Sequence, residues 1–396
     1  MPYNFDKYID RHNTSCIKYD FAAERGYPQG ILPFWVADMD FRTPQAVIEE
    51  LTQRVQHGIF GYTDPKTQYQ QTLSEWFKAH HGWNPSKDSL TITPGVVFAI
   101  CTAIRAFTKT GDAVLLQQPV YYPFSEAISG NGRKLVDSPL LLKDGHYEID
   151  FTDFEQKICE NNVKLFLLCS PHNPVGRVWR KNELERIAEI CLRHNVLVVA
   201  DEIHHEFVRP GFSHTVFSSL SPEISEITVT CTSPSKTFNL AGLQISNIFI
   251  SNPELRQKFR REVAAAGYSQ ANSLGLFACE AAYRNGAEWL NELLAYIEKN
   301  YQRTRAFLAD NLPQIKIIEP EGTYLLWLDF RSLELTDAEL DRRIINEANL
   351  WLDSGHIFGQ AGSCFQRINI ACPWSVLKKA LQNLANTFNQ TEKPSH

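Results

Sequence analysis

One lysine in the chain, Lys236, stands where an apolar, strand-like run gives way to hydroxyl-bearing residues. The run covers residues 228–232 and is followed by Ser233, Pro234, Ser235 and then the lysine. A lysine at the mouth of a buried strand is partly desolvated, which favours its neutral form. A neutral amine can attack a carbonyl and form a Schiff base. Most lysines lie in solvated loops, but this setting leads us to expect that Lys236 takes part in covalent chemistry.

Three other apolar runs also end in polar or aromatic residues. Tyr121 follows the run at 113–117, Asn173 follows the run at 164–168, and Asp201 follows the run at 196–200. Such short β-rich runs alternate with longer helical patterns, which predicts an α/β fold with a mostly parallel sheet sandwiched by helices. Ligands bind at the carboxyl edge of open parallel sheets. We therefore expect these three residues and Lys236 to converge.

The length of 396 residues favours two domains over one. We expect a large domain over residues 46–285 and a smaller α/β C-terminal domain over 286–396, with residues 1–45 packing against the smaller one. A long amphipathic helix is predicted over 289–308, and strands over 321–329 and 365–370. Residues 391–396 are predicted to form a frayed polar tail.

Composition limits the classes of partner. The net charge of −6 argues against nucleic acid or an anionic membrane as the main partner. The N-terminus lacks a secretion-signal pattern, and no apolar run reaches membrane-spanning length. Nine cysteines without a C-x-x-C pair indicate free thiols in a reducing compartment. A soluble cytoplasmic protein is the prediction.

Eight short motifs, spread in order over nearly the whole chain, together carry a resemblance. They are Trp35-Val-Ala-Asp-Met-Asp-Phe41, Phe60-Gly-Tyr62-Thr63, Thr93-Pro-Gly-Val-Val97, Pro119-Val-Tyr-Tyr-Pro-Phe124, Pro171-His-Asn-Pro-Val-Gly176, Asp201-Glu-Ile-His204, Ser233-Pro-Ser-Lys236 and Arg367-Ile-Asn-Ile-Ala-Cys-Pro373. The set resembles the pyridoxal-phosphate enzymes of the aspartate aminotransferase fold, and most closely the MalY/PatB-type cystathionine β-lyases. This resemblance implies the same fold, with pyridoxal 5′-phosphate as cofactor.

The resemblance assigns roles to residues that would hold the cofactor. Lys236 would bind it as a Schiff base and later move the Cα proton. Asp201 would pair with the pyridine nitrogen and keep the ring protonated. His204 would donate a hydrogen bond to the phenolic oxygen, where aminotransferases of this fold usually carry a tyrosine. Asn173 would bond the same oxygen. Tyr121 would stack on the ring, with Tyr122 as the rival for that place.

The phosphate and the substrate have their own expected partners. The phosphate would bind the backbone N–H groups of a helix that begins at Gly95, Val96 and Val97, with a hydroxyl from Ser233. Gln244 replaces the arginine that many aminotransferases use there, so the resemblance implies help from Tyr62 of a second subunit, and hence a homodimer.

Arg367 would clamp the substrate α-carboxylate in a bidentate fork. The resemblance also implies that Tyr121 and Tyr62 take part in catalysis, and that Tyr62 and Trp35 contact the substrate. No second arginine clearly marks a distal dicarboxylate site, which weighs against an aspartate-type transaminase.

The function implied is a carbon–sulfur β-lyase of sulfur amino acid metabolism and methionine biosynthesis, which cleaves L-cystathionine or cysteine S-conjugates to a thiol, pyruvate and ammonia. Two alternatives stay open: an aminotransferase on the same cofactor, and a cofactor-bound regulatory protein that works by binding a partner.

A metal site built from His204, His205 and Glu206 is not expected, because neighbouring residues of an extended segment point to opposite faces. A nicotinamide site is excluded because Leu135 occupies the third glycine position after Gly130-Asn-Gly132.

Overall fold

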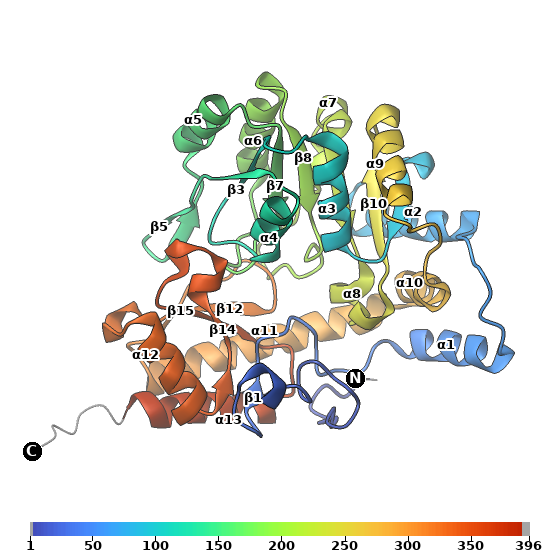
Figure 1. Cartoon of the computed structure of the whole chain (residues 1–396). Helices are drawn as coiled ribbons and strands as arrows, with labels where there is room; N and C mark the ends of the chain where they lie inside the picture. Colours follow the sequence, from blue (N-terminus) through green and yellow to red (C-terminus); the bar gives the residue numbers. More distant parts are fainter. Residues whose placement is uncertain (1–2, 390–396) are drawn as a thin grey trace, which may run out of the picture.

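The computed structural model describes residues 3–389. Its main feature is a seven-stranded sheet in the order β2-β10-β9-β8-β7-β3-β4, seen in the upper half of Figure 1. β9, β8, β7, β3 and β4 run parallel, and β10 is antiparallel to both of its neighbours. The strands are β2 Leu90–Thr93, β3 Ala113–Leu116, β4 Lys134–Asp137, β7 Leu165–Cys169, β8 Leu197–Asp201, β9 Thr228–Thr232 and β10 Ser246–Ile250.

Helices cover both faces of this sheet, as a mostly parallel sheet requires. Every residue of β3, β7 and β9 is buried. Helix α6 shows the cause on the helix side, since Leu184, Ile187, Ala188 and Cys191 recur at helical spacing and are all buried. The helices of this part are α2 Thr67–His81, α3 Val96–Phe107, α4 Pro123–Gly130, α5 Phe151–Asn161, α6 Lys181–Arg193, α7 Pro222–Glu226, α8 Pro234–Thr237 and α9 Pro253–Ala265.

A second, four-stranded sheet in the order β11-β12-β15-β14 lies below the first in Figure 1. The predicted strands at 321–329 and 365–370 are found as β12 and β15, and the predicted long helix is α11. The elements around this sheet are α11 Ala287–Asn311, β11 Lys316–Ile317, β12 Leu325–Asp329, α12 Asp337–Arg342, β13 Leu350–Trp351, β14 Asp353–Ser354, β15 Phe365–Asn369 and α13 Trp374–Phe388.

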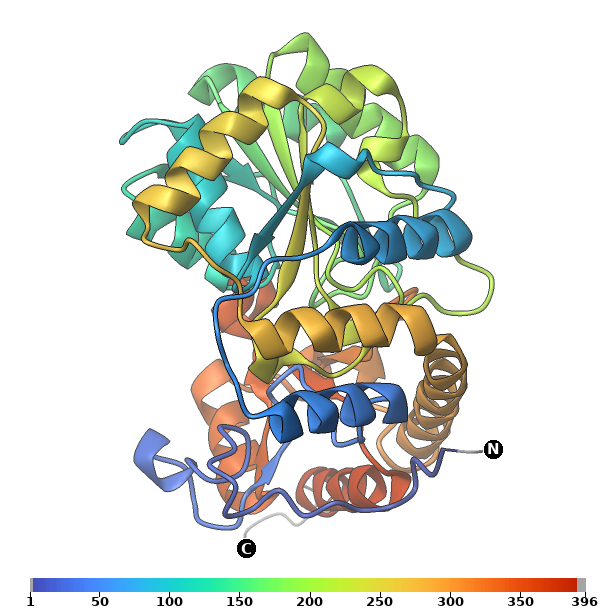
Figure 2. The same ribbon diagram turned by 90° about the vertical axis from the view of Figure 1, so that its right-hand side faces the viewer.

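The N-terminal segment packs with this C-terminal part. Strand β1, Leu32–Pro33, pairs in parallel with β13. Helix α1, Gln45–His57, lies beside α10, Ser273–Asn285, as Figure 2 shows. A small hairpin of β5, Leu141–Lys143, and β6, His146–Glu148, completes the strands. The domain boundaries near residues 45 and 285 stay predictions.

The α/β architecture predicted from the sequence is confirmed, including the parallel pairing of the four runs that end in polar residues. All nine cysteines are free. Within residues 3–389, no helix combines the length and the apolar character needed to cross a membrane. The predicted polar tail at 391–396 lies outside the described residues.

Candidate active site

A cavity of about 220 Å³ lies at the carboxyl edge of the parallel strands. The structure brings most of the residues singled out from the sequence to its wall. They are Gly95, Val96, Val97, Tyr121, Asn173, Asp201, His204, Ser233 and Lys236. These residues come from five separate chain segments, and the sheet topology places the ends of β7, β8 and β9 side by side.

Lys236 is presented by α8, a helix of a single turn. Ser233 starts this helix, because its hydroxyl accepts a hydrogen bond from the Ser235 N–H over 3.1 Å. The Lys236 Nζ donates to the carbonyl oxygen of Ala37 at 2.7 Å. Burial lowers the pKa of Lys236 to about 8, although the carboxylate of Asp38 opposes this shift. The amine is therefore neutral over a much larger part of the mildly alkaline range than an exposed lysine.

Asp201 ends β8 on the floor of the cavity. Its Oδ1 accepts a hydrogen bond from the Ile203 N–H at 3.1 Å. Burial raises the pKa of Asp201 to about 7, although that hydrogen bond and the nearby Lys236 amine oppose the shift. A buried carboxyl group with a raised pKa favours a cationic N–H partner, because such a partner stabilises its ionised form.

His204 lies three residues after Asp201, in the turn that follows β8, and also lines the cavity. Its ring is buried, and within the described residues its Nδ1 has no hydrogen-bond partner. Burial, together with the positive charges of Lys236 and Arg367, holds the pKa of His204 well below its ordinary value. His204 is therefore a neutral imidazole that carries one N–H donor and lacks a protein partner for Nδ1.

The opposite end of the cavity is suited to an anion. Helix α3 begins directly after Gly95, so the first backbone N–H groups of the helix, at Val96 and Val97, have no partner within it. Such groups and the helix dipole attract anions. Ser233 lines the wall, but its hydroxyl already donates to the Ile245 carbonyl oxygen at 2.8 Å while it caps α8.

Two further residues, Ser235 and Gln244, also line the cavity. Ser235 stands beside Ser233 and Lys236 in the same sequence motif, but no role in binding was predicted for it from the sequence. Because the Ser233 hydroxyl caps α8 and donates to Ile245, the Ser235 hydroxyl is the one of the two that is left to bind an anion in the cavity.

Of the two neighbouring tyrosines, only Tyr121 lines the cavity. Its backbone N–H donates to the Asn173 carbonyl oxygen at 3.0 Å, which ties the two loops together. Burial raises the pKa of Tyr121 to about 12. The ring of Tyr122 instead packs against Phe358, with ring centroids 6.0 Å apart. The geometry thus favours Tyr121 over Tyr122 as the residue that stacks on a ligand.

Arg367 lies on β15, beyond the cavity wall, and is buried. One guanidinium nitrogen donates to Asn173 Oδ1 at 2.9 Å, and the other donates to the Trp35 carbonyl oxygen at 2.8 Å. The second nitrogen also forms an ion pair with Asp353, the cross-strand partner of Arg367 on β14. Within residues 3–389 its Nε has no hydrogen-bond partner.

The structure does not bring Tyr62 or the Trp35 ring to the cavity. Tyr62 is 92% exposed, on the extended segment between α1 and α2. The Trp35 ring stacks on Trp351, with centroids 4.4 Å apart. Trp35 reaches the site only through its backbone carbonyl, which holds Arg367.

The segment 35–41 is one of the sequence motifs, but the motif did not predict that the backbone around Ala37 forms a wall of the site. The Ala37 carbonyl oxygen accepts from both Lys236 and Tyr324, the latter at 2.8 Å. Asn369 donates to the carbonyl oxygens of Val36 and Asp38 at 2.7 and 2.6 Å. These are backbone acceptors, so no side-chain type in the sequence could have pointed to them.

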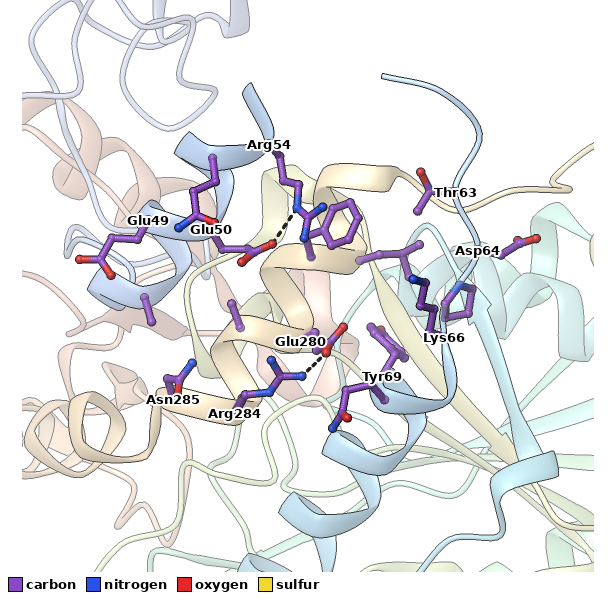
Figure 3. A pocket seen from close by; sticks show the side chains of 17 residues that line it. Glu49, Glu50, Arg54, Thr63, Asp64, Lys66, Tyr69, Glu280, Arg284 and Asn285 are labelled. Atoms are coloured by element: carbon purple, nitrogen blue, oxygen red, sulfur yellow. Dashed lines mark hydrogen bonds and ion pairs between the residues drawn. The ribbon is translucent and has the colours of Figure 1, made fainter. Parts of the chain in front are cut away.

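A larger hollow of about 470 Å³ lies elsewhere, between α1, the segment 63–69 and α10 (Figure 3). Its wall carries two ion pairs, Glu50–Arg54 and Glu280–Arg284. None of the site residues predicted from the sequence lines it.

Comparison with known proteins identifies the family. The model for "Aminotransferase class I and II" matches residues 30–384. The chain belongs to the aminotransferase class I and II family. Within this family it is similar to "Cystathionine beta-lyase PatB" of Bacillus subtilis (strain 168), with 44% identity over 96% of this chain and 98% of PatB. "Protein MalY" of Escherichia coli (strain K12) is 33% identical over 98% of this chain and 99% of MalY.

Among solved structures of this fold, cystalysin from Treponema denticola, which contains a pyridoxal 5′-phosphate cofactor, has a TM-score of 0.96 and 40% identity. The match covers 99% of this chain and 100% of cystalysin. The likeness therefore spans both sheets and the cavity between them.

Proposed function

We propose that the protein is a pyridoxal-phosphate-dependent carbon–sulfur β-lyase. It cleaves L-cystathionine and related cysteine S-conjugates to a thiol, pyruvate and ammonia. The observation that carries the proposal is the half-buried Lys236 amine, which lines a cavity shared with the buried side chains of Asp201 and His204. The full-length similarity to PatB, a cystathionine β-lyase, supports the choice of reaction.

The cavity fits the cofactor at each end. His204 Nδ1 is buried without a partner within residues 3–389, and the α3 N-terminus offers free N–H groups to a phosphate. Asp201 is a buried carboxyl group suited to a pyridinium N–H. Asn173 accepts from Arg367 through Oδ1, which leaves its amide N–H₂ to donate to the phenolic oxygen.

When bound, pyridoxal phosphate supplies an aldehyde for amine attachment and a ring that takes up the electron pair left at Cα. Lys236 anchors it and removes the Cα proton of the substrate. Asp201 holds the proton on the ring nitrogen. Arg367, buried on β15 beside Asn173, orients the α-carboxylate. Loss of the Cβ–S bond then releases the thiolate, and water converts the remaining three-carbon unit to pyruvate and ammonia.

Incubation with L-cystathionine in the absence of any keto acid tests this proposal. Pyruvate and homocysteine should form in equal amounts with the native protein and with Lys143→Ala, an exposed control lysine that pairs only with Glu148. Lys236→Ala should form neither. Pyridoxal-phosphate content, read from absorbance, shows whether each preparation is loaded.

Two results would reverse the assignment. Turnover that starts only when a keto acid is added would make the protein an aminotransferase. A loaded protein that is inactive under both conditions would favour the regulatory, partner-binding alternative.

The site is completed by a homodimer in this proposal. Large apolar residues are exposed around the segment that carries Tyr62, with Ile59 at 73% and Phe60 at 61% exposure. Such a group of exposed apolar side chains is typical of an interaction surface. Tyr62 of one subunit then reaches the phosphate and substrate of the other, and Trp35 acts on the substrate end through its backbone carbonyl, which holds Arg367. Light scattering of the purified protein should give twice the mass of 45.2 kDa.

The cellular setting follows from the same proposal. Nine free cysteines suit a reducing cytoplasm. The negative net charge does not suit a nucleic-acid partner. Release of homocysteine places the activity in sulfur amino acid metabolism and methionine biosynthesis.

A further inference from the structure

A second group of polar side chains lies behind the cofactor cavity and takes no part in the chemistry above. His205 and Glu206 follow His204 in the loop after β8, and His81 ends α2. One ligand atom from each of His81, His205 and Glu206 lies within 4.8 Å of the others. Their side chains are 6%, 1% and 6% exposed. None of them lines the cavity.

The hydrogen bond of His205 to the backbone determines which of its ring nitrogens faces His81 and Glu206. Its Nδ1 donates to the backbone carbonyl oxygen of Glu202, so in the neutral ring Nε2 is the unprotonated nitrogen. That Nε2 lies 3.2 Å from Glu206 Oε1 and has no hydrogen-bond partner within residues 3–389. With a neutral ring, two electron pairs face each other in a buried space, and either a proton or a metal cation between them stabilises the arrangement.

The same Glu206 oxygen is the centre of the group. His81 Nε2 lies 3.1 Å from it, and the Trp76 indole N–H donates to it at 2.6 Å. The separations of 3.1 and 3.2 Å are close to those between neighbouring ligands that each stand about 2.0–2.2 Å from a tetrahedral zinc ion. The Trp76 N–H and the Glu202 carbonyl oxygen are contacts of the kind that orient zinc ligands from outside.

We propose that His81, His205 and Glu206 form a Zn²⁺ site. Two imidazoles and a carboxylate are a ligand set that zinc accepts. Bound zinc joins the end of α2 to the loop that follows β8. Because His204 precedes the site directly and faces the cavity, the metal stiffens the backbone that supports the cofactor without touching it.

The proposed site agrees with the expectation from the sequence that His204 and His205 do not bind one ion. It departs from the expectation that no metal binds in this part of the chain. His204 and His205 do point to different surroundings, as the extended-segment argument predicts, so they do not share an ion. The third ligand comes instead from His81, more than 120 positions earlier, and local sequence spacing could not reveal it.

The test is titration of chelator-treated, cofactor-loaded protein with Zn²⁺, followed by calorimetry and by elemental analysis after gel filtration. The native protein should retain about one equivalent, and Co²⁺ in its place should give the visible absorption of a low-coordinate site. His81→Gln should weaken binding at least about tenfold. His57→Gln is the matched control, since His57 is likewise the last residue of its helix, α1, and is exposed. It should bind as the native protein does.

Three outcomes would overturn the proposal. The first is a native protein without stoichiometric zinc, and the second is unchanged zinc binding in His81→Gln. The third is loss of zinc from Cys159→Ser, which would place the ion at the surface pair of Cys159 and His194. The absence of stoichiometric zinc would mean that a proton on His205 already balances the Glu206 charge. Cofactor absorbance and the melting temperature show whether each variant is folded.

Discussion

Two regions carry residues that the family resemblance assigns to one active site, and they differ in how far a single chain completes them. The cavity around Lys236 is enclosed by buried groups whose pKa values are shifted by burial. The segment around Tyr62 is open, with the tyrosine 92% exposed. One chain can thus set up the acid–base chemistry, whereas in the proposed homodimer the contact of Tyr62 with the site depends on a second chain.

The strongest way to test the enclosed region is Asp201→Asn. An amide cannot hold a proton on the ring nitrogen, so kcat for pyruvate formation should fall on the order of 10²-fold or more, the scale of losing one preorganised electrostatic partner. The control is Asp144→Asn, an exposed turn residue with φ of 50°, which asparagine tolerates. A kcat for Asp201→Asn within a factor of three of native would contradict the role of Asp201.

Arg367→Lys tests the substrate end of the same region. Lysine keeps the charge but not the planar fork, and a lost charge-assisted hydrogen bond costs about 1.5–3 kcal/mol. We expect kcat/KM for L-cystathionine to fall about 10- to 100-fold, mostly through KM. Arg331→Lys, at an exposed ion pair with Asp329, serves as control. A variant with native KM would show that Arg367 does not bind the carboxylate.

For the open region, Tyr62→Phe should lower kcat/KM about fivefold, the scale of one hydrogen bond. Tyr8→Phe, another exposed tyrosine, should have no effect.

Mixed dimers sharpen the comparison between the regions. Tyr62→Ala and Lys236→Ala subunits, unfolded and refolded together, should recover about a quarter of the native activity, because each mixed dimer holds one intact site. No recovery, despite mixed dimers seen by mass spectrometry, would place Tyr62 in its own subunit's site or in none.

The smallest effect concerns pH. The pKa of Lys236 is lowered to about 8, so its neutral, nucleophilic fraction rises as pH increases through 8 rather than through 10.5. The rate at which pyridoxal phosphate attaches to the cofactor-free protein, followed by absorbance between pH 6.5 and 9.5, should rise with a midpoint near 8. A rate that still increases tenfold per unit at pH 9.5 would show an unshifted lysine.

The sequence predicted the enclosed region well because its residues stand at strand ends. Lys236, Asp201 and Asn173 each follow an apolar run, and parallel pairing of β7, β8 and β9 brings those ends together. The pattern that identifies a strand therefore also locates its functional end.

Other contacts of the site could not be predicted from the residues that surround them in the sequence. Asp353 meets Arg367 only through the register of β14 with β15. The Ala37 carbonyl oxygen meets Lys236 across 199 positions. The exposure of Tyr62 is likewise a property of the folded surface that the motif around it could not show. Such contacts depend on how the two sheets pack, which residue order alone does not specify.

The bonds from Asn369 to the carbonyl oxygens of Val36 and Asp38 have a consequence for how the protein is made. The segment that contacts Lys236 is synthesised 331 to 333 positions before the residue of β15 that holds it. Until β15 has been synthesised and has paired, residues 36–38 lack these anchors. Stable cofactor capture during translation should thus signal that the chain has been synthesised through β15.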